Sequence, residues 1–450
     1  MKQQTTILLA LMLAGVTLST AALAAQPMAT CRTHAQAAVQ AWAQGHDKQM
    51  NQYFAPVITS RVTPEKWHET WEQMEAQFGA FQKMDTPEPY ELAGHEVLAA
   101  RMHFSKALQP MAIMVTCDDR DRINGFRLLP AHAIPGLVKA SVEPKVAGVV
   151  SHDVKVPSPL GPLPGTLTLP EGNGPFPAVV LVQGSGAHDR DETLGPNKPF
   201  RDIAIGLARH GIASLRYDKR TYVYGAKLAQ IKKPFTVDQE VTDDALSALH
   251  LLADQDRIAA GRVFLLGHSL GALMAPRIGK RDAQLAGIIM LAAPARPLLD
   301  VLIEQTRESG AKAGESKTQI EKDIQAFVHE RQLLDAADPA HPPQGSFFNG
   351  PQSYWLSLHD YDQVAVARKL RMPILILQGK SDFQVSYKRD FLRWKKALAG
   401  HANVSFHAYP GLSHLFRKAG PTGTAADYQR PGKVSSVVIN DIAAWIKAQP

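Results

Sequence analysis

The feature that most constrains this chain is the pentapeptide Gly267-His268-Ser269-Leu270-Gly271 with its flanking residues. The apolar run Val263–Leu266 before it predicts a strand buried on both faces, and the residues after it have helical character. A turn this tight between a strand and a helix strains the backbone of Ser269 and lifts its hydroxyl clear of the sheet edge. Gly267 and Gly271 are needed because a Cβ at either position would collide with the neighbouring strand or helix. The alternative is a chance match, but the flanking elements favour Ser269 as a nucleophile.

The N-terminus carries a separate signal. Lys2 precedes an apolar stretch over Ile7–Leu18, and Ala22-Leu23-Ala24 follows as a small-residue cleavage site. This stretch is too short to span a bilayer, which takes about 20 residues. Residues 1–24 are therefore predicted to be a bacterial secretory signal peptide. No lipobox-like sequence precedes Cys31 and no later segment is long enough to span a membrane, so we expect a periplasmic or secreted protein without a stable membrane anchor.

Two cysteines, Cys31 and Cys117, are present in the chain. An even number of cysteines in an oxidising compartment predicts one disulfide between them, and the alternative is two unpaired buried thiols. Neither is accompanied by a histidine motif that would indicate catalysis.

The basic residues are scattered. The net charge of +7 falls to +6 when Lys2 leaves with the signal peptide, and no basic run is longer than a pair such as Lys232-Lys233. This distribution is typical of a solvated surface and excludes a nucleic-acid-binding face as the main function.

With 450 residues the chain can form two domains. Helices followed by strands predict a small α+β domain over residues 25–130, with helices at Ala35–Ala43 and after the N-cap Thr63. The turn-rich residues 131–150 are predicted to be a linker. The strands expected in the small α+β domain lie at Val97–Ala99, Met111–Val115 and Ile123–Leu129.

Residues 151–450 alternate short apolar strands with amphipathic helices after an opening hairpin. This pattern predicts an α/β domain with a mostly parallel sheet covered on both faces. The alternation breaks over residues 294–369, which we interpret as a helical cap inserted over the sheet. Four aromatic residues of this segment either line a substrate pocket or pack the cap onto the sheet, and both alternatives stay open. They are Phe347, Phe348, Tyr354 and Trp355.

A serine hydroxyl needs a histidine base held by a carboxylate to act as a nucleophile. In this type of sheet the acid follows a late strand and the histidine follows the next one. Asp382 follows the apolar run Ile374–Leu377, and His414 follows Val404–Tyr409. The chain order Ser269, Asp382, His414 therefore predicts a catalytic triad.

Other acids and histidines are less suitably placed. Asp360 and Asp362 precede their strand, Asp390 falls within a helix, and His407 lies inside a strand. His268 is beside the serine in sequence, but the turn directs it away from the hydroxyl, which favours a packing role.

The negative oxygen of a tetrahedral intermediate requires backbone N–H donors. One donor is expected from Leu270, the residue after the nucleophile, and the other from Ser185 in the loop after the first long strand. This loop, Gln183-Gly184-Ser185-Gly186, could alternatively be a plain glycine-rich turn.

From about residue 150 to 450 the chain resembles the α/β-hydrolase superfamily, in its serine aminopeptidase-like and dienelactone hydrolase-like branch. The pentapeptide at Ser269, Gly379-Lys380-Ser381-Asp382 and Gly411-Leu412-Ser413-His414 carry the resemblance. The segments Gln183–Glu192 and Arg216–Arg220 are similar to those of bacterial exported carboxylesterases of this branch, which often have a small N-terminal domain. Many relatives have His-Gly where this chain has Gln183-Gly184, so no role is carried over to the Gln183 side chain.

The resemblance implies an α/β-hydrolase fold and an enzyme that cleaves small carboxylic esters through an acyl-enzyme. A serine peptidase, an acyltransferase or a non-catalytic binding protein are the alternatives, the last disfavoured by the complete triad. The charged residues His188–Glu192 and Arg216–Arg220 either frame the loop around Ser185 or recognise a polar part of the substrate, and the framing role is favoured. No cofactor or metal is expected, because no His, Asp or Cys cluster has ligand spacing. The oligomeric state does not follow from the sequence.

Overall fold

The computed structural model describes residues 27–450 except 93, 135, 139–141, 229–233, 339–344 and 348–349. The signal peptide predicted over residues 1–24 lies outside the described residues. The chain divides into two compact units, Met1–Val142 and Glu143–Pro450, and each is described by itself. No described helix is long and apolar enough to cross a membrane.

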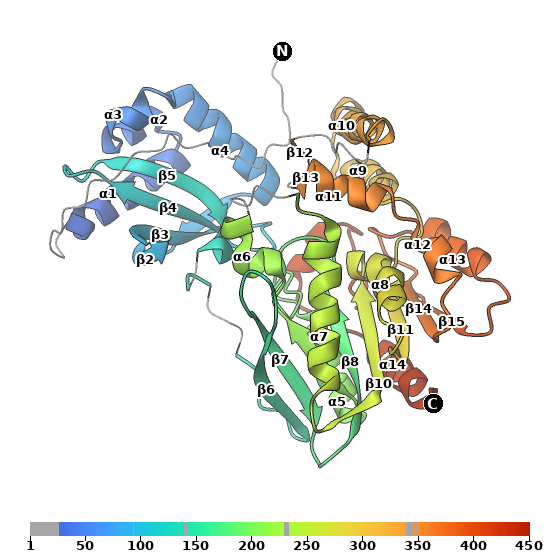
Figure 1. Cartoon of the computed structure of the whole chain (residues 1–450). Helices are drawn as coiled ribbons and strands as arrows, with labels where there is room; N and C mark the ends of the chain where they lie inside the picture. Colours follow the sequence, from blue (N-terminus) through green and yellow to red (C-terminus); the bar gives the residue numbers. More distant parts are fainter. Residues whose placement is uncertain are drawn as a thin grey trace. The chain divides into compact units, whose positions relative to one another are not determined.

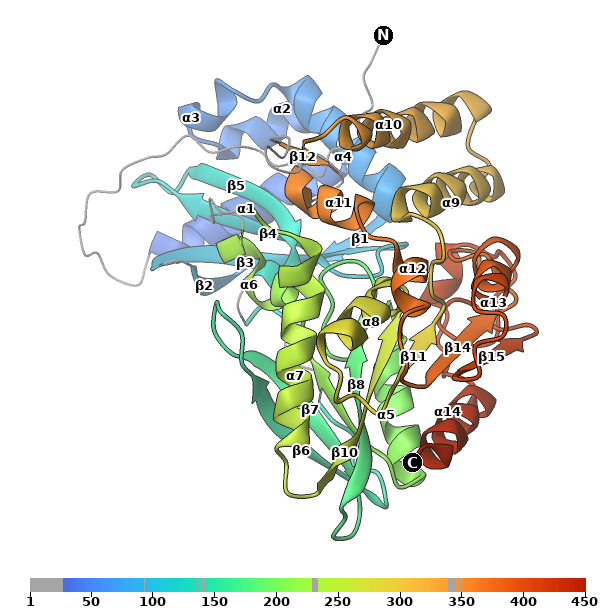
Figure 2. The ribbon, with the colours of Figure 1, turned by 45° about the vertical axis from the view of Figure 1, so that its right-hand side comes forward.

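The first unit packs helices on one face of an antiparallel sheet (Figure 2). Thr63 caps the main helix by accepting a hydrogen bond from the Lys66 amide, as the sequence predicts. Trp67, Trp71 and Met74 of this helix are buried in the core of the unit. The helices are α1 (Pro27–Ala43), α2 (Asp47–Met50), α3 (Pro56–Thr59) and α4 (Pro64–Phe78), with η1 (Asn51–Tyr53) and η2 (Ala131–Ala133) as short turns. The strands are β1 (Phe81–Met84), β2 (Glu88–Leu92), β3 (His95–Phe104), β4 (Met111–Cys117) and β5 (Ile123–Pro130).

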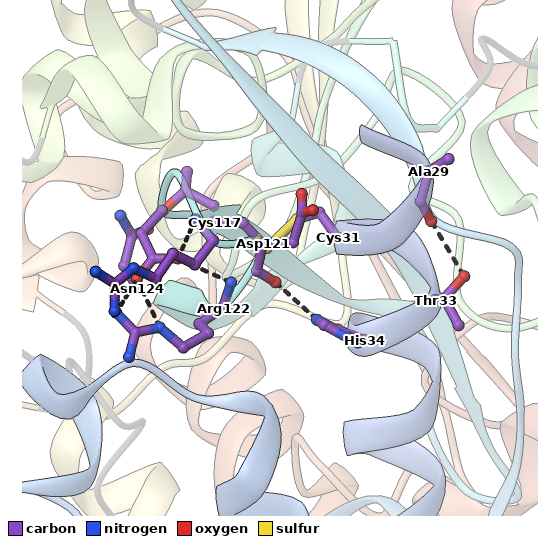
Figure 3. Close-up of a disulfide and its surroundings, with 11 residues drawn as sticks. Ala29, Cys31, Thr33, His34, Cys117, Asp121, Arg122 and Asn124 are labelled. Carbon is purple, nitrogen blue, oxygen red and sulfur yellow. Dashed lines mark hydrogen bonds and ion pairs between the residues drawn. A yellow bond between two sulfur atoms is a disulfide. The ribbon is translucent and has the colours of Figure 1, made fainter. Parts of the chain in front are cut away.

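A disulfide joins Cys31 of α1 to Cys117 at the end of β4 (Figure 3). The two Cα atoms are 6.0 Å apart, a normal separation for such a bond. The predicted pairing is therefore confirmed. The bond ties the first helix to the sheet across 86 residues of sequence.

The predicted linker, residues 131–150, is too long. Ala131, Ile134 and Leu137 are buried against the second face of the first unit's sheet, so the start of this segment belongs to that unit. At the other end, the first strand of the second unit already begins at Val149. Turn-forming residues hid these apolar contacts, because burial in such a segment has no regular period.

The second unit is built on an eight-stranded sheet of order β15-β14-β11-β10-β8-β9-β7-β6 (Figure 1). The strands from β9 to β15 in this order are parallel, and the opening hairpin joins antiparallel at the other edge. The fold class is confirmed: the sheet is mostly parallel, as the alternation predicts, and agrees with the fold that the resemblance implies. The strands are β6 (Val149–Val156), β7 (Leu163–Pro170), β8 (Phe176–Val182), β9 (Ala213–Tyr217), β10 (Ile258–His268), β11 (Gly287–Leu291), β14 (Ile374–Gly379) and β15 (Val404–Tyr409).

Helices cover both faces of this sheet, because its central strands are apolar on both sides. On one face α5 (Pro199–Arg209) and α14 (Ser436–Ala448) share a core with the sheet. On the opposite face α7 (Asp243–Ala253) and α8 (Leu270–Arg281) do so, as Figure 1 shows. Before η3 and α7 the Thr236 amide donates to Gln239 Oε1, three residues along the chain. The shorter elements are α6 (Arg220–Leu228), η3 (Asp238–Thr242), η4 (Tyr387–Phe391), α13 (Leu392–Ala397) and η5 (Ala425–Gln429).

The segment predicted as a cap, residues 294–369, lies between β11 and β14 and is mainly helical. Ser316 caps its longest described helix by accepting a hydrogen bond from the Gln319 amide. Its elements are α9 (Leu298–Ala313), α10 (Lys317–Asp335), α11 (Gln352–His359) and α12 (Gln363–Ala367), with the short hairpin β12 (Ser346–Phe347) and β13 (Gly350–Pro351).

The disulfide predicts a measurable contribution to stability. Because it closes a long loop in the unfolded chain, its loss should destabilise the first unit by about 4–5 kcal/mol. We expect the double variant Cys31→Ser/Cys117→Ser to unfold at a correspondingly lower urea concentration, with reduction of the parent protein giving the same shift. Titration of free thiols in the unfolded, non-reduced parent should find none, and two would contradict the assignment.

Candidate active site

Ser269 occupies a sharp turn between β10 and α8. Its backbone has φ of 53° and ψ of −113°, a strained conformation for a residue other than glycine. Its amide is held by the carbonyl oxygen of Leu291, 2.9 Å away on the neighbouring strand. A Cβ at Gly271 would overlap the backbone carbonyl of Val182, and one at Gly267 would overlap the carbonyl of Gly271. The backbone thus has the shape that the pentapeptide predicts.

Asp382 and His414 lie in the loops that leave β14 and β15. His414 Nδ1 donates a hydrogen bond to Asp382 Oδ2 at 2.8 Å, and both side chains are almost fully buried. The carboxylate is fixed by three further donors, the amides of Gln384 and Val385 on Oδ1 and the Gln378 side chain on Oδ2. Such a carboxylate orients the imidazole so that Nε2 is left to exchange a proton.

His268, next to Ser269, links these loops. One ring nitrogen contacts the Glu192 carboxylate at 2.9–3.0 Å, and the other lies 3.0 Å from the carbonyl oxygen of His414. Both partners only accept hydrogen bonds, so both ring nitrogens donate and His268 is an imidazolium. The ring centroids of His268 and His414 are 4.6 Å apart. His268 is therefore more than the packing residue that the sequence suggests.

The buried charges of Glu192 and His268 stabilise each other. Burial would lower the pKa of His268, but the charge of Glu192 and their hydrogen bond outweigh it and raise the pKa above the usual 6.5. Burial would likewise raise the pKa of Glu192, but the charge of His268, its hydrogen bond and the nearby His188 hold it below the usual 4.5. Both shifts therefore favour the charged form of each group.

No hydrogen bond joins the Ser269 hydroxyl to His414 in the described part of the chain. His268, the last residue of β10 and directly before Ser269, links the two loops by contacting the carbonyl oxygen of His414. Catalytic contacts of this kind are often long in the absence of substrate and shorten in the reacting complex.

The loop after β8 lies against Ser269. A methyl group at Gly184 would come within 3.1 Å of Ser269 Cβ. The Gly184 amide donates to Glu192 Oε1 at 2.6 Å, whereas the amides of Ser185 and Leu270 have no acceptor among the described residues. The two predicted oxyanion donors are the ones left free. The Gln183 side chain contacts the carbonyl of Tyr217 instead of the site.

The charged segments after β8 and β9 form buried ion pairs with each other and with neighbouring elements. Arg190 pairs with Asp218 at 3.0 Å, and the fully buried Arg216 pairs with Asp191. These contacts favour the framing role over substrate recognition. Of the residues in these two segments, Glu192 and Lys219 form hydrogen bonds with Gly184 in the loop of Ser185. The sequence did not distinguish them from their charged neighbours.

The comparisons with known proteins decide the family. Residues 179–426 match the model of the Alpha/beta hydrolase family, and Esterase EstD of Thermotoga maritima is 32% identical over 389 residues, which are 86% of this chain and 89% of EstD. The chain belongs to the alpha/beta hydrolase family.

Two solved structures are also similar to this alpha/beta hydrolase. Est1E from Butyrivibrio proteoclasticus shares 15% identity over 66% of this chain and 99% of its own, with a TM-score of 0.44. A puromycin-hydrolyzing peptidase from Mycobacterium tuberculosis shares 16% identity over 82% of this chain and 48% of its own, with a TM-score of 0.43.

Three of the four aromatic residues predicted for the hydrolase pocket are described, and Phe348 lies outside the described residues. Trp355 is 5% exposed in the core and donates from its indole nitrogen to the carbonyl of Phe347 at 2.7 Å. The Tyr354 hydroxyl donates to Glu240 Oε2 at 2.7 Å. These contacts favour the packing alternative over a pocket lining.

A small surface hollow lies beside the acid and histidine loops of the hydrolase. It is lined by residues that include Ser381, Phe383, Ser413, Arg417 and Tyr428 but not by Ser269. No group of three or more His, Cys, Asp or Glu side chains in the described ranges is arranged to hold a metal ion.

The Glu192–His268 pair predicts a pH-dependent contribution to stability. A group whose pKa is raised by folding stabilises the folded state at pH values below its unfolded pKa, and this contribution is lost as pH rises through its folded pKa. A group whose pKa is lowered stabilises the folded state above its unfolded pKa, and this contribution is lost as pH falls through its folded pKa. We expect Glu192→Gln to lower the free energy of unfolding most between pH 4.5 and 6.5, with the deficit shrinking as pH rises through the raised pKa of His268. Urea unfolding over a pH series measures it. Asp153→Asn, whose side chain is 96% exposed, is the control, and a deficit that keeps growing as pH rises above 6.5 would contradict the pairing.

The aromatic packing of the cap predicts a second effect on stability. Trp355→Ala should destabilise the hydrolase unit by about 3–5 kcal/mol, because it empties a buried site. The control Leu333→Ala removes a side chain on a residue that is 41% exposed and should change stability by less than about 0.5 kcal/mol. A Trp355→Ala protein with unchanged unfolding but an altered preference for ester chain length would restore the pocket interpretation.

Proposed function

We propose that this protein is an exported serine hydrolase that cleaves small carboxylic esters through an acyl-enzyme on Ser269. The observation that carries the proposal is the buried Asp382–His414 hydrogen bond at the sheet edge where the strained Ser269 turn emerges. Family membership and the similarity to EstD over most of both chains add support for ester chemistry.

In the first half of the proposed reaction, His414 Nε2 takes the proton of the Ser269 hydroxyl as its oxygen attacks the ester carbonyl carbon. Asp382 keeps Nδ1–H oriented and stabilises the imidazolium that forms. The oxygen that becomes negative is met by the Leu270 and Ser185 amides. When the tetrahedral intermediate collapses, the bond to the alcohol oxygen breaks, and His414 returns its proton to the departing alcohol.

In the second half, water replaces the alcohol. His414 removes a proton from the water as it attacks the acyl carbon, and the same two amides bind the second oxyanion. Collapse releases the acid and returns the proton to Ser269. The cycle needs no group beyond the side chains and amides already described, and a carboxylic ester with water as co-substrate balances it.

Export is part of the proposal and rests on the leader-like residues 1–24 and the Cys31–Cys117 disulfide. Structural disulfides persist mainly in oxidising compartments, which favours the periplasm or the medium. Detection of the mature N-terminus near Ala25 in the periplasmic fraction would test it, and a cytoplasmic protein that retains Met1 would contradict it.

The triad predicts the effect of removing the nucleophile. Ser269→Ala should lower kcat on the order of 10⁶-fold, because triad members act as a unit. A fluorophosphonate should label Ser269 in the parent and nothing in the variant, as measured by mass spectrometry of the labelled peptide. Ser247→Ala, a serine that donates to a helix carbonyl on α7, is the control and should keep full activity. Most activity surviving in Ser269→Ala would refute the mechanism.

The class of substrate is tested by offering p-nitrophenyl esters of graded chain length beside aminoacyl arylamides. Turnover of esters with arylamides untouched supports the esterase. The reverse preference would identify a serine peptidase, and dominant acyl transfer to an added alcohol over hydrolysis would identify an acyltransferase.

A further inference from the structure

Lys219 is a buried cation just beyond the end of β9, with 1% of its surface exposed. Its ammonium group donates to the carbonyl oxygen of Gly184 at 2.7 Å and to that of Gly186 at 3.1 Å. Its third partner is Glu240 Oε1, 3.5 Å away. An ammonium has three hydrogens, so its donors are matched by these three acceptors. Two of the three lie in the loop beside the nucleophile.

The carbonyl contacts determine where the loop's amides point. In a trans peptide the C=O and N–H of one unit point in opposite directions. Among the described residues the only cis peptide is Gly174-Pro175, so the Gly184–Ser185 peptide is trans. Because Lys219 holds the Gly184 carbonyl on one side of the loop, the Ser185 N–H must point to the other side, away from the ammonium.

The neighbouring groups of the loop are engaged by other residues. Glu192 takes the Gly184 amide, and His188 Nε2 contacts the carbonyl oxygen of Ser185 at 2.7 Å. A carbonyl oxygen only accepts hydrogen bonds, so His188 donates this one from Nε2. The amide of Ser185 is thus left available for a ligand while the peptide units around it are held. A hydrogen bond at the carbonyl of a peptide also polarises its N–H and strengthens it as a donor.

A cation is costly to bury unless it is paired. Glu240 supplies the pairing charge and is itself fixed by the hydroxyls of Thr221 and Tyr354. Lys219 is therefore also paired on the side opposite the loop, over the longer distance of 3.5 Å. Both hydrogen bonds of the ammonium that meet the geometric criteria go to the loop of Ser185.

We propose that Lys219 is a positioning residue that aims the Ser185 amide at the oxyanion by holding the carbonyls of Gly184 and Gly186. This inference rests on the proposed function, since it assigns Lys219 a role in the same site. It predicts a loss specific to the transition state, because the ground-state ester does not need the strong donor.

The test compares Lys219→Met with Arg220→Met. Arg220 is equally buried but pairs with Asp244 and does not contact the loop, so it controls for the loss of a buried cation. With p-nitrophenyl butyrate, we expect Lys219→Met to lower kcat about 10²-fold with KM changed less than threefold. Butylboronic acid forms a tetrahedral adduct, and its inhibition constant should rise by the factor by which kcat/KM falls. Arg220→Met should lose stability but keep the parent's kcat and boronate affinity.

The conservative variant Lys219→Arg keeps the charge beside Glu240 and protects the test if the methionine variant does not fold. A guanidinium is planar and cannot replace a point donor between two carbonyls, so its kcat should fall between those of the parent and Lys219→Met. Its rate of fluorophosphonate labelling should fall in parallel.

Three outcomes separate the hypotheses. Lys219→Arg or Lys219→Met with the parent's kcat and boronate affinity, whatever its melting temperature, overturns the positioning role while leaving the esterase intact. Equal losses of kcat in Lys219→Met and Arg220→Met also overturn it, because they indicate general loosening. A parent protein without ester turnover or boronate binding refutes the proposed function itself.

Discussion

The hydrolase unit depends on the close approach of α8 to strands β8 and β10 at the Ser269 turn. Gly267 and Gly271 have no space for a side chain, because a Cβ at either position would overlap the backbone of α8 or of β8. Ser269 has a strained conformation here, and the hydrogen bond from its amide to Leu291 on β11 holds it. A backbone so confined cannot relax, and the hydroxyl it carries is therefore presented at the carboxyl edge of the sheet.

Around this turn, buried charged side chains form the contacts between neighbouring loops. Glu192 joins the loop of Gly184 to His268, and His268 joins the nucleophile turn to the histidine loop. Lys219 holds the other side of the Gly184 loop. Each charge is matched by an opposite charge or by polar backbone, which is the condition for burying it. Directional contacts of this kind fix the orientation of amides and rings, which apolar packing does not.

The network also explains why the predicted pocket residues are found in packing roles. Tyr354 ends on Glu240, the partner of Lys219, and Trp355 is buried with Phe347 in the cap. Through this route the cap segment is connected to the residues that hold the oxyanion loop. The aromatic cluster belongs to the structure that supports the site, and its apolar character reflects core packing.

The sequence by itself determined the α/β class, the position of the Ser269 turn and the elements that carry Asp382 and His414. These are local signals, because strand period, capping residues and the glycine spacing act over a few residues. The disulfide was predictable because only two cysteines are present. The buried state of residues 131–137, the imidazolium at His268 and the roles of Glu192 and Lys219 were decided only by tertiary structure. A charged residue in a loop looks the same in sequence whether it faces solvent or a buried carbonyl, since its partners come from strands far along the chain.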